Sequence, residues 1–225
     1  MWLCSAGGCA SHRSASVAER SPTRADRPVL RELSEDPVPA TVISKTTDLP
    51  TIEKTDRRLA DALAAVARNP TGDAHRRVAA EYLRLSIYDA AYDQYASALK
   101  INRRDAEAYE GIARLWRDAG FPGLSLRPAH QAIFYAPKWA QARNTLGTVL
   151  HALGDSVAAE QEFNKALALD PTAGYVLNNL CYLSFARGDL SRATEQCGEA
   201  VRLDAELAAA RANLAAVTAA IEKTP

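Results

Sequence analysis

Apolar and small residues recur along this chain with a period of 34 residues. When units are counted from residues 72, 106, 140 and 174, with a partial fifth from 208, the seventh position is always large and apolar. Its residues are Val78, Ile112, Leu146, Leu180 and Leu214. The eighth position is always small, with Ala79, Ala113, Gly147, Cys181 and Ala215. A repeat of this length predicts an array of helical units that bury their apolar faces against each other.

Each unit is expected to contain two antiparallel helices joined by a short turn. Small residues return twelve positions after the first small class, at Ala91, Ser125, Ala159 and Ala193. A second helix must approach the first closely there. Glycine, which accepts the backbone angles that end a helix, marks the turns at Gly120, Gly154 and Gly188. Pro137 and Pro171 fall in connections between units, where proline is tolerated.

This pattern resembles the tetratricopeptide repeat family. The unit 140–173 is most similar to the family signature, through Leu146, Gly147, Gly154, Ala159, Phe163, Ala166 and Pro171. The resemblance implies an all-α fold, a right-handed superhelical solenoid of helix hairpins. It also implies that the chain binds other proteins and is not an enzyme.

The solenoid is expected to occupy residues 54–225, with capping helices over 56–68 and 206–222 at the two ends of the four repeats. Thr55 is the expected cap of the first of these helices. The second unit is irregular, because Pro128 falls where the middle of its second helix should be. We therefore expect that helix to begin at Pro128 and residues 121–127 to form a surface loop.

Residues 1–53 are rich in Pro, Ser, Thr and Arg and lack apolar periodicity, which predicts a disordered or tether segment. The first nine residues end in small residues before Cys9, and they resemble the end of a truncated bacterial lipoprotein signal. That resemblance implies lipid attachment at Cys9 and export to a membrane surface. The alternative is an unprocessed N-terminus on a cytoplasmic protein.

The charge balance excludes some classes of partner. The chain has 27 basic and 27 acidic residues, so no broad positive field favours nucleic acid. No apolar run is long enough to span a bilayer, which limits membrane association to a lipid anchor.

No catalytic chemistry is visible in the sequence. The four histidines share no metal-binding spacing, and no phosphate-binding loop or nucleophile motif is present, so we predict no metal and no cofactor. Cys181 and Cys197 fall in the two helices of one unit. They could form a disulfide in an exported protein or remain buried thiols, and we favour the second interpretation.

A partner is expected to bind where the first helices of the hairpins line the concave groove. The predicted contacts begin with the charged side chains Arg76, Glu110, Arg114 and Arg117. They continue through the polar side chains Gln141, Asn144, Thr148 and His151. They end with Tyr175, Asn178, Tyr182 and Phe185, where aromatic rings are typical binding anchors. Asn179 and Asn213 share one repeated position and resemble a short asparagine ladder that contacts a peptide backbone.

These features predict a non-catalytic scaffold or adaptor that holds a partner polypeptide. If the chain is a membrane-tethered lipoprotein, the resemblance implies a role in assembling an envelope, pilus or secretion complex. The alternative function is that of a regulatory or substrate-recruiting subunit of a separate enzyme, such as a glycosyltransferase. The sequence assigns no oligomeric state.

Overall fold

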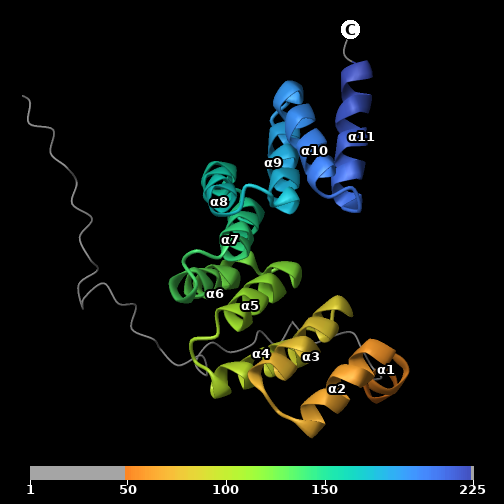
Figure 1. The fold of residues 1–225 in the computed structure, drawn as a ribbon, viewed down its shortest axis with the longest axis vertical. Coiled ribbons are helices and arrows are strands. Elements are labelled where there is room, and N and C mark those ends of the chain that lie inside the picture. Colours follow the sequence, from red (N-terminus) through yellow and green to blue (C-terminus); the bar gives the residue numbers. More distant parts are fainter. Residues whose placement is uncertain (1–48, 224–225) are drawn as a thin grey trace, which may run out of the picture. The chain divides into compact units, whose positions relative to one another are not determined.

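The computed structural model describes residues 49–223, and every regular element in this range is an α-helix (Figure 1). The helices are α1 (Leu49–Thr55), α2 (Arg57–Arg68), α3 (Gly72–Arg84), α4 (Tyr88–Ile101), α5 (Ala106–Asp118), α6 (Pro122–Tyr135), α7 (Ala140–Ala152), α8 (Ser156–Leu169), α9 (Gly174–Ala186), α10 (Leu190–Leu203) and α11 (Ala208–Glu222). Four hairpins, α3/α4, α5/α6, α7/α8 and α9/α10, follow each other along the chain. The predicted all-α array of helical hairpins is confirmed.

Consecutive hairpins stack through both of their helices. Each helix packs against the next one in sequence, so the second helix of one hairpin contacts the first helix of the following hairpin. The first helices also contact one another directly, in the pairs α3 with α5, α5 with α7 and α9 with α11. This second set of contacts brings equivalent positions of neighbouring units together.

The turn inside each hairpin has the backbone conformation that the glycine pattern predicts. Gly120, Gly154 and Gly188 have φ angles of 88°, 88° and 79°. At the equivalent position of the first unit, Ser86 adopts a φ of 60°. A residue with a side chain pays a steric penalty in this left-handed region, on the order of 1–2 kcal/mol. The α3/α4 turn is therefore the most strained of the four.

The two helices of a hairpin meet where the eighth and twenty-fourth positions of the unit face each other. The pairs are Ala113 with Ala129, Gly147 with Phe163, and Cys181 with Cys197. In the second unit Leu146 from the next hairpin completes the same small cluster. In the third unit the Phe163 ring occupies the space that a Cβ on Gly147 would need, at 2.5 Å. The same contact of the repeat is thus made by an alanine pair, by a glycine and a phenylalanine ring, or by a disulfide.

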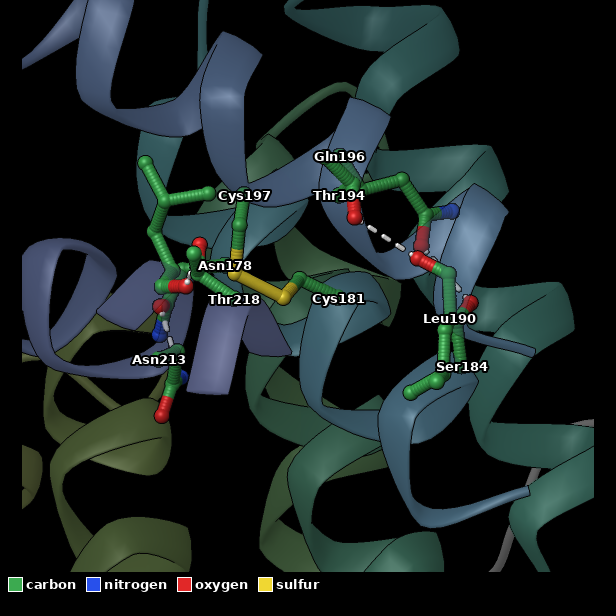
Figure 2. The surroundings of a disulfide bond; sticks show 10 residues. Asn178, Cys181, Ser184, Leu190, Thr194, Gln196, Cys197, Asn213 and Thr218 are labelled. Atoms are coloured by element: carbon green, nitrogen blue, oxygen red, sulfur yellow. Dashed lines mark hydrogen bonds between the residues drawn. A yellow bond between two sulfur atoms is a disulfide. The ribbon is translucent and has the colours of Figure 1, made fainter. Parts of the chain in front are cut away.

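A disulfide between Cys181 and Cys197 joins α9 to α10, so the favoured interpretation of two unbonded thiols is wrong (Figure 2). Their Cα atoms are 5.3 Å apart, within the range that a disulfide spans. The two side chains are fully buried in a cluster with Ala193 and Val217, which lies on α11. Facing positions in a close-packed hairpin account for the bond, because both cysteines replace residues that touch in the other units.

The irregular second unit also differs from its prediction. Helix α6 begins at Pro122, with Phe121 as its N-cap residue, and it continues through Pro128 to Tyr135. The expected surface loop over 121–127 is therefore helical. Ser125 is completely buried at the position of the repeat that Ala91 and Ala159 occupy. Burial of the inner face of α6, including Pro128, Ala129 and Ala132, offsets the interior proline, which costs about 3 kcal/mol in an isolated helix.

The N-terminal end of the described range contains one more helix than expected. Helix α1 includes residues 49–53, which were assigned to the tether, and the Tyr82 hydroxyl donates a hydrogen bond to Glu53 Oε1 at 2.7 Å. Asp56, and not Thr55, caps α2 by accepting from the backbone N–H of Leu59 at 3.0 Å. These polar contacts onto α3 fix a segment that has no apolar pattern of its own. Cys9 and the proposed signal remnant lie outside the described residues.

Two glycines in helices provide a test of the close packing. A Cβ added to Gly111 would overlap the Tyr95 ring, whereas one added to Gly198 on α10 would meet nothing within 4 Å. Gly111→Ala is expected to lower the free energy of unfolding by about 1–3 kcal/mol through overpacking. Gly198→Ala should raise it by roughly 0.5–1 kcal/mol, because alanine loses less backbone entropy in a helix. Urea denaturation of both variants measures the difference, and equal effects of the two substitutions would contradict the packing described here.

Candidate functional site

The candidate site is the face formed by the second, fifth, sixth, ninth and twelfth positions of α3, α5, α7, α9 and α11, here called the binding face. Side chains cap the first two of these helices. Thr71 Oγ1 accepts from the Ala74 N–H at 3.2 Å, and Asp105 Oδ1 accepts from the Ala108 N–H at 3.1 Å. The helices α7, α9 and α11 begin without a side-chain cap. Their register therefore depends on contacts with neighbouring helices.

Three side-chain hydrogen bonds cross the binding face at a constant sequence separation of 35 residues. Each joins the fifth position of one unit to the sixth position of the next, and we call these bonds rungs. Thr145 Oγ1 donates to Glu110 Oε1 at 2.7 Å, Asn179 Nδ2 donates to Asn144 Oδ1 at 2.8 Å, and Asn213 Nδ2 donates to Asn178 Oδ1 at 2.9 Å. The rungs tie α5 to α7, α7 to α9 and α9 to α11.

A second series of contacts is offset from the rungs by one helical turn. Its members are 31 residues apart. Arg117 Nη1 donates to Thr148 Oγ1 at 2.7 Å, and the His151 and Tyr182 rings meet edge to face at 5.5 Å. Gln141 Nε2 also lies 3.5 Å from Glu110 Oε1. The two series together fix the orientation of the polar side chains that the sequence assigned to partner binding.

The first unit departs from the rung pattern because Gly111 occupies the sixth position of the second unit and has no side chain to donate. Arg76, at the fifth position of the first unit, pairs instead with Asp105 and with Glu107, at 3.0 Å from the latter. Gly111 leaves room for the Tyr95 ring, which packs directly on its backbone. The α3 end of the binding face is therefore held by ion pairs and the α9 end by amides.

The predicted contact residues differ widely in the exposed fraction of their side chains. Glu110 and Asn144 are each only 6% exposed, so little of either side chain is available to a partner. Asn178, Asn179 and Asn213 are half-buried, and Phe185 packs against the cluster around the disulfide. Tyr182 is 49% exposed beside the edge of the His151 ring. Of the aromatic residues assigned to this face, Tyr182 presents the most surface to solvent.

Tyr95, which is buried beneath the face, and Tyr175, a half-buried member of it, both remain protonated at neutral pH. Burial raises the pKa of Tyr95 to about 12, with a further contribution from the nearby Glu110 carboxylate and an opposing one from Arg114. Burial also raises the pKa of Tyr175, and Asp170 and Glu110 raise it further. Their hydroxyl groups therefore stay uncharged.

Each rung amide uses only part of its hydrogen-bonding capacity. An asparagine amide has two N–H donors and an oxygen that accepts two bonds. Within residues 49–223, Asn178 bonds through Oδ1 and Asn213 through Nδ2, which leaves the Asn178 Nδ2 and the Asn213 Oδ1 unused (Figure 2). The same holds for Asn144 Nδ2 and Asn179 Oδ1. The rungs thus orient the amide groups and leave some of their donors and acceptors available.

Sequence reasoning identified most of these residues but not their pairing. It placed Asn179 and Asn213 in one ladder at equivalent positions, whereas each bonds to the fifth-position asparagine of the preceding unit. It omitted Thr145, which completes the rung to Glu110. The signal was present as a polar residue at the fifth position followed by another 35 residues later.

The described residues contain no group of three or more His, Cys, Asp or Glu side chains that could hold a metal ion. Between Leu49 and Lys223, no helix combines the length and apolar character needed to cross a membrane.

The fold is similar to solved structures of tetratricopeptide repeat proteins. A thermophilic protein of this type from Thermus thermophilus superposes with a TM-score of 0.67 at 21% identity, covering 76% of this chain and 94% of the other. A chain of the APC/C hetero-tetramer Cut9–Hcn1 gives a TM-score of 0.68 at 18% identity, over 77% of this chain and 35% of that one. YrrB, a tetratricopeptide repeat protein with an unusual peptide-binding site, gives 0.50 at 19% identity, over 72% and 84%.

No protein-family model and no curated protein sequence matches the chain. At identities near 20%, the structural similarity establishes the tetratricopeptide-type fold.

Proposed function

We propose that this chain is a non-catalytic adaptor that holds a partner polypeptide on the binding face. The observation that carries the proposal is the pair of asparagine rungs next to the exposed Tyr182 ring. The rungs offer a regular series of amide donors and acceptors, which suits the repeating N–H and C=O groups of a peptide backbone. Tyr182 supplies the large, rigid surface that is typical of a binding anchor.

The comparisons support the same class of function. Two of the similar structures are described by their partners, one as part of a hetero-tetramer and the other as carrying a peptide-binding site. Both have the hairpin array found here, and the rung amides of this chain have unused donors and acceptors on the first helices of that array. The remaining members of the binding face, including Arg114 and Arg117, are proposed to select the charge of the partner segment at the α5 end.

We also propose that the adaptor works outside the cytoplasm, tethered through Cys9. The buried disulfide supports this placement, because such bonds form and persist in oxidising compartments. A membrane-anchored adaptor of this kind would assist the assembly of an envelope, pilus or secretion complex. Mass spectrometry of the native protein tests the tether, and an intact Met1 with an unmodified Cys9 would refute it.

The binding proposal is tested by affinity capture with the full chain and two single variants. Tyr182→Ala removes the exposed ring, and Arg114→Glu reverses the charge of a side chain that is 43% exposed. Because Arg114 also pairs with the buried Glu110 carboxylate, circular dichroism must first show that this variant folds. Loss of a tyrosine anchor is expected to weaken partner binding roughly 30-fold, the equivalent of about 2 kcal/mol. Isothermal titration with the captured partner measures the change.

Val157→Ala is the matched control, since Val157 is an exposed apolar residue on α8, outside the binding face. It should leave both the captured proteins and their affinities unchanged. If Tyr182→Ala and Arg114→Glu retain every partner at wild-type affinity, the binding face is assigned wrongly.

A further inference from the structure

A second surface with unusual chemistry lies at the turns that connect the first three hairpins. It combines exposed cations with an aromatic cluster, and we call it the turn patch. Its members are Lys100, Arg103, Arg104, Phe134, Tyr135 and Lys138. These residues come from the ends of α4 and α6 and from the turns that follow them, so the patch is separate from the binding face.

The aromatic part of the turn patch is built on a buried ring. Tyr109 stacks on Tyr135 with ring centroids 5.6 Å apart, and the Phe134 ring meets Tyr135 edge to face at 5.1 Å. The Tyr109 hydroxyl donates to the Arg103 carbonyl oxygen at 3.2 Å, which joins the cluster to the α4–α5 turn. Phe134 is nevertheless 60% exposed. A phenylalanine held rigidly and left open to water is costly to solvate and suited to contact with another apolar group.

The cations of the turn patch lack counterions within the described part of the chain. Lys100, Arg103, Arg104 and Lys138 are exposed, and none of them makes an ion pair with another residue between 49 and 223. The nearby carboxylate of Asp105 is buried and is engaged by Arg76. Some exposed arginines elsewhere are paired, as Arg202 is with Glu199 at 2.6 Å. The positive charge of the patch is therefore uncompensated.

The later connecting turns show that this charge is not a general property of the repeat. Asp170 follows α8 and Asp204 follows α10, at the repeat position that Asn102 occupies after α4. Aspartate side chains there accept backbone N–H groups of their own turns, as Asp170 Oδ1 does from Thr172 at 3.0 Å. The basic and aromatic character is confined to the first two connecting turns.

We propose that the turn patch docks an acidic polypeptide segment that carries an aromatic or large apolar side chain. Carboxylates of the segment would pair with Arg103 and Arg104, whose planar guanidinium groups bind carboxylates in a bidentate manner. Its apolar side chain would pack on Phe134. An acidic protein segment fits better than nucleic acid, because the cations are few and the chain as a whole has no net charge.

The experiment uses the full chain and a defined probe, a fluorescein-labelled peptide of glutamates around one central phenylalanine. Fluorescence anisotropy at low ionic strength is expected to show saturable binding that weakens with added salt. Reversing both charges with Arg103→Glu and Arg104→Glu should weaken binding by about tenfold or more. Phe134→Ala should weaken it to a similar extent. All three residues are exposed, so the variants are expected to melt as the wild type does.

Two controls separate the turn patch from nonspecific attraction. The double variant Arg57→Glu with Arg58→Glu makes the same charge change on α2, where both side chains are exposed, and it should leave binding unchanged. Replacing the phenylalanine of the peptide by alanine should weaken binding to the wild type, with no further loss in Phe134→Ala, because the two rings act as a pair.

Equal binding by all variants would overturn the proposal, as would the absence of saturable binding by the wild type. A labelled single-stranded oligonucleotide that binds the patch more tightly than the peptide would also overturn it, in favour of a nucleic-acid site. These outcomes are independent of the binding face, because Tyr182→Ala leaves the turn patch intact.

Discussion

Replacing Cys181 and Cys197 together by alanine is expected to lower the free energy of unfolding by about 3 kcal/mol. The disulfide closes a loop with a sequence separation of 16 residues, and its loss restores the conformational entropy of that loop in the unfolded chain. Both sulfur atoms also fill a core cluster that includes Val217 of α11. Denaturant unfolding followed by circular dichroism measures the change. Hydrogen exchange should locate it in α9, α10 and α11, since stability in a repeat array is set by nearest neighbours.

Reductant provides the control for the disulfide prediction. It should destabilise the wild type and leave the double variant nearly unchanged. Thiol titration in denaturant should detect two more thiols after reduction than before it, from Cys181 and Cys197. An unchanged thiol count on reduction, or an unfolding curve of the wild type that does not respond to reductant, would contradict the bond between α9 and α10.

Phe163→Ala is expected to cost more than the disulfide, about 3–5 kcal/mol. The Phe163 ring is 2% exposed, lies over Gly147 and belongs to the core cluster formed by α7, α8 and α9. Its removal leaves a cavity that the glycine below cannot fill. Chemical denaturation of the variant measures the loss, and Phe134→Ala is the matched control. Phe134 is 60% exposed, so its replacement should change stability by less than about 0.5 kcal/mol.

A double-mutant cycle sharpens this prediction. Gly147→Ala alone should destabilise the protein, because its Cβ would lie 2.5 Å from the ring of Phe163. In the Phe163→Ala background the same substitution should become neutral or stabilising, since the space is then empty and alanine favours the helix. The same sign of effect in both backgrounds would show that the ring does not pack on Gly147.

Most of the fold was predictable from the 34-residue period of the sequence. Glycine turns and small residues at close contacts are local requirements, so their spacing was sufficient to place the hairpins. The start of α6 was not predictable in this way. Local propensity argues against a helix through Pro128, and the packing of Pro128, Ala129 and Ala132 in the core reverses that balance. Helix α1 was missed for a similar reason, because a polar contact from Tyr82 of α3 to Glu53 holds it, and Arg84 of α3 holds the next residue, Asp56.

The candidate site was predictable in its residue types but not in its connections. Periodicity placed Asn144, Asn178, Asn179 and Asn213 on the same side of the first helices. Whether an amide there bonds to a guest or to the next helix depends on the stagger between units, which the period alone does not define. The pattern also could not predict whether Cys181 and Cys197 are oxidised, because a small buried thiol and a half-cystine fit the same packing position.

The location of the disulfide gives the array a mechanical polarity. Hairpins α3/α4, α5/α6 and α7/α8 are closed by noncovalent contacts, whereas α9/α10 is crosslinked. A force that pulls from the N-terminal side would unzip the first three hairpins one after another and then stall, because the bonded hairpin cannot extend.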